Sequence, residues 1–134
     1  MKLLTKQQVL TSKDLKSEIV EVKEWGLKIG NEEINHVKLL ELMSHEKSVY
    51  ESSIMDFDVQ KVRKDAGDFR ARLVGLTLVD HENNRLFSNK EIQELGKKSA
   101  SVMERLYDVS AKLSGLTKKS EEALLKNSNG QSEN

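Results

Sequence analysis

The stretch "SVMERLYDVSAKLSGL", residues 101–116, carries the clearest secondary-structure signal in the chain. Its apolar residues recur at alternating spacings of four and three, which is the period of one helix face. They are Val102, Leu106, Val109, Leu113 and Leu116. A coiled-coil seam is the alternative reading, but the stripe covers only about two heptads, so the buried face of a globular core is favoured.

Two further helical segments precede this helix. Residues 88–96 read "SNKEIQELG", in which Ser88 as N-cap and Glu91 three residues later form a capping box. Residues 56–79 carry another apolar stripe at helical spacing. Its members are Phe69, Leu73 and Leu76. Gly75 lies inside this pattern, where a glycine permits close packing of another element.

The first half of the chain changes period. Residues 18–25, "EIVEVKEW", alternate apolar and polar side chains, which predicts a half-buried strand. Residues 34–43 fit either a strand or a helix, and we favour a strand that pairs with the first one. Residues 26–33 contain two glycines and an asparagine and are interpreted as turns. A two-stranded ribbon is marginal by itself, so we expect it to lie on helices.

Polar caps mark three more helices. Thr5 would cap a short helix over "KQQVL". Ser44 fits the N-cap of a helix over residues 45–56, in which Val49, Ile54 and Met55 are available for burial. Thr117 would cap a last short helix.

These elements predict an α+β fold that is mainly α-helical, with a small N-terminal two-stranded β element packed on a bundle of about four to five helices. The 134 residues suit one domain, and no repeat or linker divides them. We therefore expect a single domain over residues 1–127. Residues 128–134, "NGQSEN" with the preceding serine, form a polar tail that we expect to be disordered.

Composition excludes several classes of function. The chain has 22 basic and 22 acidic side chains, so no net charge attracts nucleic acid or an anionic membrane. It has no cysteine, which rules out disulfides, thiolate nucleophiles and cysteine-based zinc sites. The apolar run near the N-terminus is only two residues long. We therefore expect neither a signal peptide nor a membrane anchor there.

The strongest candidate for chemistry is the run Asp80-His81-Glu82. Side chains of consecutive residues diverge in regular structure, and the run lacks the alternating acids and glycine of a calcium loop. Asn83 and Asn84 follow it and favour a tight turn. We interpret the run as a polar turn rather than a metal or acid–base site.

Other catalytic patterns are missing. "HEKSVYE", starting at His45, lacks the second histidine of a metalloprotease helix. Asp56 and Asp58 would need burial to act as an acid–base pair, and their setting is polar. The sequence contains neither a nucleophile elbow nor a phosphate-binding glycine loop. We predict no catalytic, cofactor or metal site, and no enzyme activity.

Several stretches taken together form a recognisable order and spacing. They are Glu24-Trp25-Gly26, Ser44 to Glu51, Arg70 to Asp80, Leu86-Phe87, and Gly96 to Leu116. In this combination, over roughly residues 18–117, the chain resembles the tail assembly chaperones of long-tailed, siphovirus-type phages and prophages. The sequence departs from the family pattern in a longer segment between Trp25 and Val37, and in Asn83-Asn84 where a glycine is usual.

The resemblance implies a non-enzymatic protein that binds the tape measure protein, keeps it soluble and helps the tail tube assemble around it. The major tail-tube protein is a second candidate partner, and a homo-oligomer is compatible with an uncovered apolar stripe. The implied location is the host bacterial cytoplasm during assembly, with no place in the mature virion. Leu125-Lys126-Asn127 is compatible with a slippery codon run for a frameshifted longer form.

Candidate partner-binding residues are Trp25, Leu86 and Phe87. Trp25 has an alternative role as a core plug, which is the better expectation from its position at the end of a strand. Two other functions stay open at this point: a structural minor tail or head–tail connector protein, and a generic helical adaptor.

Overall fold

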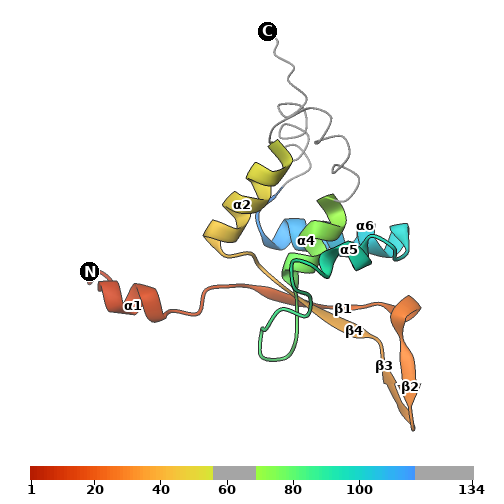
Figure 1. The fold of residues 1–134 in the computed structure, drawn as a ribbon. Helices are drawn as coiled ribbons and strands as arrows, with labels where there is room; N and C mark the ends of the chain where they lie inside the picture. Colours follow the sequence, from red (N-terminus) through yellow and green to blue (C-terminus); the bar gives the residue numbers. More distant parts are fainter. Residues whose placement is uncertain (56–68, 117–134) are drawn as a thin grey trace.

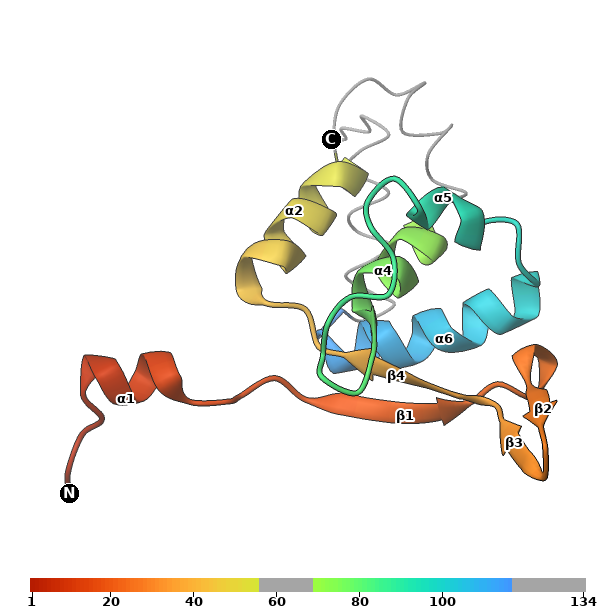
Figure 2. The same cartoon turned by 60° about the horizontal axis from the view of Figure 1, so that its bottom comes forward.

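A three-stranded antiparallel sheet carries most of the helices on one side in the computed structural model (Figures 1 and 2). The structure describes residues 1–55 and 69–116. The elements in chain order are α1 (Lys6–Thr11), β1 (Ser17–Glu21), the 3-10 helix η1 (Lys23–Trp25), β2 (Leu27–Ile29), β3 (Glu32–Ile34), β4 (His36–Leu40), α2 (Ser44–Met55), α4 (Phe69–Thr77), β5 (Leu78–Val79), α5 (Ile92–Leu95) and α6 (Ala100–Leu113).

The sheet has the strand order β1-β4-β5. Strand β1 pairs with β4 over its whole length, from Ser17 opposite Leu40 to Glu21 opposite His36. Strand β5 pairs on the other side of β4, with Leu78 opposite Leu39. The alternation read in the sequence sends every second side chain toward the helices. The result is a strip of core residues along the sheet: Val20, Val22, Val37, Leu39 and Leu78.

Helix α4 runs through the centre of the fold and continues directly into β5. It packs against α6, α5 and β4, and most of its side chains are buried. Gly75 is essential to this packing, because a Cβ built there would lie 2.6 Å from Cγ1 of Ile92 in α5. The expectation that Gly75 permits close packing is confirmed.

Helix α6 closes the core with the predicted stripe. Val102 and Leu106 are fully buried, Leu116 is buried, and the other two stripe residues pack partly buried against the core. The stripe is therefore a core face, as favoured from its length. A buried hydrogen bond joins α6 to α4, with 2.8 Å between Oγ1 of Thr77 and Oγ of Ser110.

Two parts of the chain project from the ends of the sheet. At one end, an extended segment carries α1, which has no buried residue (Figure 2). Its capping box forms as the sequence indicates, with Thr5 and Gln8 bonded reciprocally. At the other end, β2 and β3 form a separate antiparallel hairpin, with Gly30 at φ +63° in its turn.

The predicted fold class is correct as an α+β, helix-rich arrangement, but the β element is larger than the expected two strands. The sequence predicts only turns over residues 26–33, whereas three-residue strands flank Gly30 and form the hairpin. Strand β5 was missed because two residues directly after a helical stripe show no alternating pattern. Helix α1 lies outside the helical layer (Figure 1).

Two helix starts differ in detail from the prediction, and a third predicted helix lies outside the described residues. Helix α2 begins at Ser44 instead of being capped by it, and Glu46 accepts a hydrogen bond from the N–H of Met43. Only half of the 88–96 capping box forms, since Glu91 accepts from the N–H of Ser88 at 2.8 Å and α5 starts at Ile92. The helix expected after Thr117 and the tail 128–134 lie outside the described residues, as do residues 56–68.

The buried Thr77–Ser110 bond makes a testable contribution to stability. Thr77→Val keeps the volume but leaves the Ser110 hydroxyl without its partner, which should cost about 1–3 kcal/mol in the free energy of unfolding. Ser110→Ala should cost less, because the Thr77 hydroxyl also lies within bonding distance of the carbonyls of Leu73 and Val74. Urea denaturation measures both values.

The double variant Thr77→Val/Ser110→Ala supplies the control for that prediction. It removes both hydroxyls, so its cost should be smaller than the sum of the two single costs. Strict additivity would contradict a direct bond between the two side chains.

A second prediction concerns the exposed ion pair between η1 and α6. The Arg105 guanidinium donates to both carboxylate oxygens of Glu24, at 3.0 and 2.9 Å, and this bond is the main reason that the pKa of Glu24 falls from 4.5 to about 2. Because the folded pKa is the lower one, the pair stabilises the fold above pH 4.5 and loses that effect as the pH falls toward 2.

An NMR titration of the Glu24 carboxyl carbon measures this pKa. In Arg105→Gln the midpoint should move up toward 4.5. A midpoint that stays near its original value in that variant would show that Arg105 does not hold the carboxylate.

Candidate functional site

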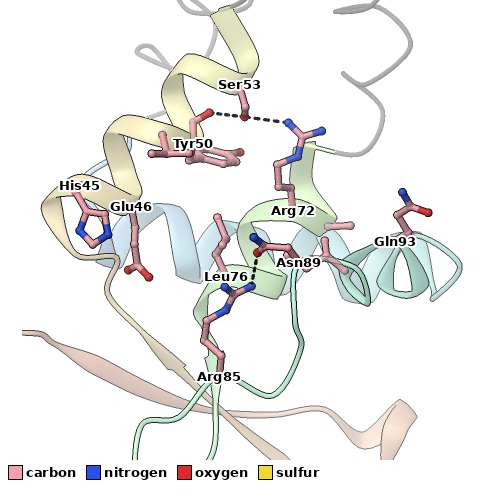
Figure 3. A pocket seen from close by; sticks show the side chains of 13 residues that line it. His45, Glu46, Tyr50, Ser53, Arg72, Leu76, Arg85, Asn89 and Gln93 are labelled. Carbon is pink, nitrogen blue, oxygen red and sulfur yellow. Dashed lines mark hydrogen bonds between the residues drawn. The ribbon is translucent and has the colours of Figure 1, made fainter.

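Helices α2, α4 and α5 enclose a groove of about 510 Å³, which we call the α2–α4–α5 groove (Figure 3). The loop that enters α5 forms its remaining wall. Its apolar lining consists of Val49, Tyr50, Ala71, Leu76 and Ile92. Its polar lining consists of His45, Glu46, Ser53, Arg72, Arg85, Asn89, Gln93 and the backbone at Gly96.

The position of α2 explains why Val49 faces this groove. The core side of α2 is fixed by Tyr50 and Ile54, which are spaced four residues apart and are 1% and 4% exposed. Val49 lies 100° around the helix from Tyr50 and is 66% exposed. The expectation that Val49 is buried is therefore wrong, and that for Ile54 is confirmed. The side chain of Met55 lies outside the description.

Close packing of α5 on α4 sets the floor of the groove. The side chain of Ile92 packs directly on Gly75, where α4 has no side chain of its own. Leu76, the next residue in α4, is only partly buried and presents apolar surface to the groove. The floor is thus apolar and is held by residues that belong to the core.

Two arginines place positive charge on the groove walls. The Arg72 guanidinium donates to Oγ of Ser53 at 2.9 Å, and that hydroxyl donates to the carbonyl of Tyr50 at 2.7 Å (Figure 3). The Arg85 guanidinium donates to Oδ1 of Asn89 at 3.1 Å. These bonds orient Arg72 on α4 and Arg85 in the loop before α5, both beside the apolar floor, which suits a peptide segment with apolar and acidic side chains.

The three predicted partner-binding residues lie elsewhere. Trp25 is in η1 and Phe87 is in the loop after β5, and both are partly buried against the core. Leu86 is 49% exposed in the same loop. None of the three belongs to the lining of the α2–α4–α5 groove in the described part of the chain. The sequence carries no clear signal for the groove, because it does not show which of the neighbouring residues Val49 and Tyr50 faces the core.

The Asp80-His81-Glu82 run forms the predicted polar turn. Oδ1 of Asp80 accepts hydrogen bonds from the N–H groups of Asn84 and Glu82, each at 2.9 Å. These bonds, that from Asn84 foremost, lower the pKa of Asp80. Asn83 adopts φ 69°, the left-handed conformation that asparagine tolerates.

Within residues 1–55 and 69–116, no three histidine or acidic side chains gather in a way that would hold a metal ion. No helix in those ranges is both long enough and apolar enough to cross a membrane. Asp56 and Asp58, considered above as an acid–base pair, lie outside the description.

Comparison with known proteins places this fold. The solved structure of the bacteriophage HK97 tail assembly chaperone is similar, with a TM-score of 0.54, 18% sequence identity, and coverage of 80% of this chain and 94% of the other. At that identity the match supports the fold alone. No curated protein matches the sequence. The model of the family described as phage tail assembly chaperone matches residues 5–126. The chain therefore belongs to the phage tail assembly chaperone family, whose members are not enzymes.

Proposed function

We propose that this chaperone holds an apolar helical segment of the tape measure protein in the α2–α4–α5 groove and keeps that protein soluble until the tail tube surrounds it. Tape measure binding is the known role of such chaperones. The observation that supports this groove is its construction: an apolar floor of Leu76 and Ile92, with an exposed Val49 at the rim and two arginines beside it.

The size of the groove suggests how a helix would bind. A volume of about 510 Å³ accommodates several side chains from one face of a helix rather than the whole helix. Anchors spaced three or four residues apart would reach the floor, as in other helix-in-groove complexes. Acidic residues beside those anchors would meet Arg72 and Arg85.

The open shape of the groove also suits release. Each leucine-sized anchor that is fully buried contributes about 1.5–3 kcal/mol, and the loss of rotational and translational freedom offsets much of the total. A few anchors therefore give moderate affinity, which an assembly factor needs if it is to leave when tube subunits replace it. We infer that the protein acts in the host cytoplasm and leaves before the virion is complete, so purified particles should lack it.

Residues outside the groove are also candidate contacts for a partner. Leu86 is exposed beside the groove-lining residue Arg85 and stays a candidate contact residue. Trp25 and Phe87 also stay predictions, although their packing against the core makes them poor choices for mutational tests. The major tail-tube protein remains a candidate second partner.

Co-expression with the tape measure protein tests the proposal. The wild-type chain should render that protein soluble and co-purify with it. Val49→Asp should reduce the yield of soluble complex at least tenfold, because it puts a carboxylate at the rim of an apolar site and loses about 1.4 kcal/mol or more of binding free energy. Since Val49 is exposed, the variant should keep its fold by circular dichroism.

Ser48→Asp is the matched control, since it adds the same charge on α2 at a residue that does not line the groove. Leu86→Asp tests the loop contact separately. If Val49→Asp binds normally and Leu86→Asp does not, the contact surface is the loop and the groove assignment is wrong. A tape measure protein that stays insoluble with the wild-type chain would contradict the proposed function itself and favour a structural tail component.

A further inference from the structure

Two cations in the α2–α4–α5 groove have only neutral partners. The Arg72 guanidinium donates to a serine hydroxyl, and that of Arg85 donates to a side-chain amide. Among the residues that the structure describes, neither arginine forms an ion pair with a carboxylate. Glu46 also lines the groove, but its carboxylate accepts a bond at 2.8 Å from the backbone N–H that precedes α2. A segment with apolar and acidic side chains would therefore complement this groove.

One segment of the chain itself has that composition. Residues 117–127, "TKKSEEALLKN", directly follow the described part of the chain. The sequence predicts a short helix here, capped by Thr117. At helical spacing Glu121 precedes Leu124 by three residues and Leu125 by four, so the acid and the two leucines share one face. That face offers two apolar anchors and a carboxylate, the combination that the groove complements.

The described chain ends beside the helix that forms one wall of the groove. The carbonyl of Gly115 accepts a hydrogen bond from Nζ of Lys47 at 3.5 Å, and Leu116 is buried in the core. Lys47 lies in the first turn of α2, one residue after the groove-lining Glu46. The 117–127 segment therefore starts next to the first turn of α2.

The first four residues of the segment are long enough to pass around this helix. Lys47 lies about 200° around α2 from Val49, which lines the groove. A helix with its side chains is about 10–12 Å wide. Residues 117–120, when extended, span up to about 14 Å. Glu121 and the two leucines after it can thus be delivered to the groove side of α2.

We propose that residues 117–127 bind the α2–α4–α5 groove of their own chain and cover it until a tape measure segment displaces them. Leu124 and Leu125 contact the apolar floor, and Glu121 pairs with the groove arginines. The role as a competitor rests on the proposed function, whereas occupancy of the groove by the segment does not. Covering the groove keeps its apolar floor away from unrelated chains while the chaperone is free.

A weak contact is sufficient for this role because the segment is tethered. A segment on a short linker has an effective concentration of about 1 mM at its own site. With a Kd of about 100 μM for the same contact, the segment would occupy the groove about nine-tenths of the time. A competing helix would then bind about tenfold more weakly than it binds an open groove.

A nitroxide label on an introduced cysteine tests the occupancy, because the natural chain contains no cysteine. Asn127→Cys carries the label at the end of the segment, away from the face with the two leucines. In the labelled full chain, the backbone amide NMR signals of Val49, Leu76 and Ile92 should broaden. A mixture of ¹⁵N-enriched chains without the label and labelled chains without ¹⁵N should show no broadening, because the contact lies within one chain.

Substitutions in the full chain separate the proposed binding face from the rest of the segment. Leu124→Gln/Leu125→Gln removes both anchors without a change in charge. It should abolish the broadening and raise the affinity for a synthetic helical segment of the tape measure protein about tenfold. Ser120→Gln/Ala123→Gln is the matched control, since it places two glutamines on the other side of the predicted helix. It should leave both the broadening and the affinity unchanged.

The two measurements distinguish failure of this inference from failure of the proposed function. Groove amides that stay sharp in the labelled chain, or that stay broadened in Leu124→Gln/Leu125→Gln, would overturn the inference. Broadening in the mixed sample would assign the contact to another copy and would also overturn it. Equal affinity of wild type and Leu124→Gln/Leu125→Gln, with the broadening present, would refute competition and place the tape measure segment elsewhere. If that segment binds neither chain, the proposed function fails and the broadening alone decides the occupancy.

Discussion

Helix α4 is the central element, against which α5, α6 and the sheet pack. Gly75 brings α5 within touching distance of α4, the Thr77–Ser110 bond fixes α6 against it, and the direct step from Thr77 into Leu78 ties it to the sheet. An extra methyl group at residue 75 would meet Ile92 before the helices reached their present spacing. The close approach of these two helices therefore determines both the core and the floor of the α2–α4–α5 groove.

Several apolar side chains are left uncovered by this core packing. Val49 on α2, Ile19 on β1 and the apolar side chains of the arm and hairpin are exposed although they resemble core residues in type. A chaperone needs such surfaces, because its task is to cover apolar segments of other chains for a limited time. These exposed apolar side chains lie on different elements of the fold.

The sequence predicts the elements with a strong, long period and misses the shorter ones. The 102–116 stripe and the alternation in 18–25 each report burial of a face, so the core face of α6 and the pairing of β1 with β4 follow from them. Strand β5 has only two residues, and it forms because α4 ends where Leu78 lies opposite Leu39 of β4. The groove could not be predicted, because it requires the phase of Val49 relative to Tyr50 and the contact of Gly75 with Ile92, which is long-range.

The most direct test of the binding site is a backbone amide NMR experiment on the chain, with a synthetic helical segment of the tape measure protein as the titrant. The groove account predicts that the largest shift changes fall at Val49, Leu76 and Ile92. Changes concentrated at Trp25 and the hairpin, with the groove amides unaffected, would contradict it.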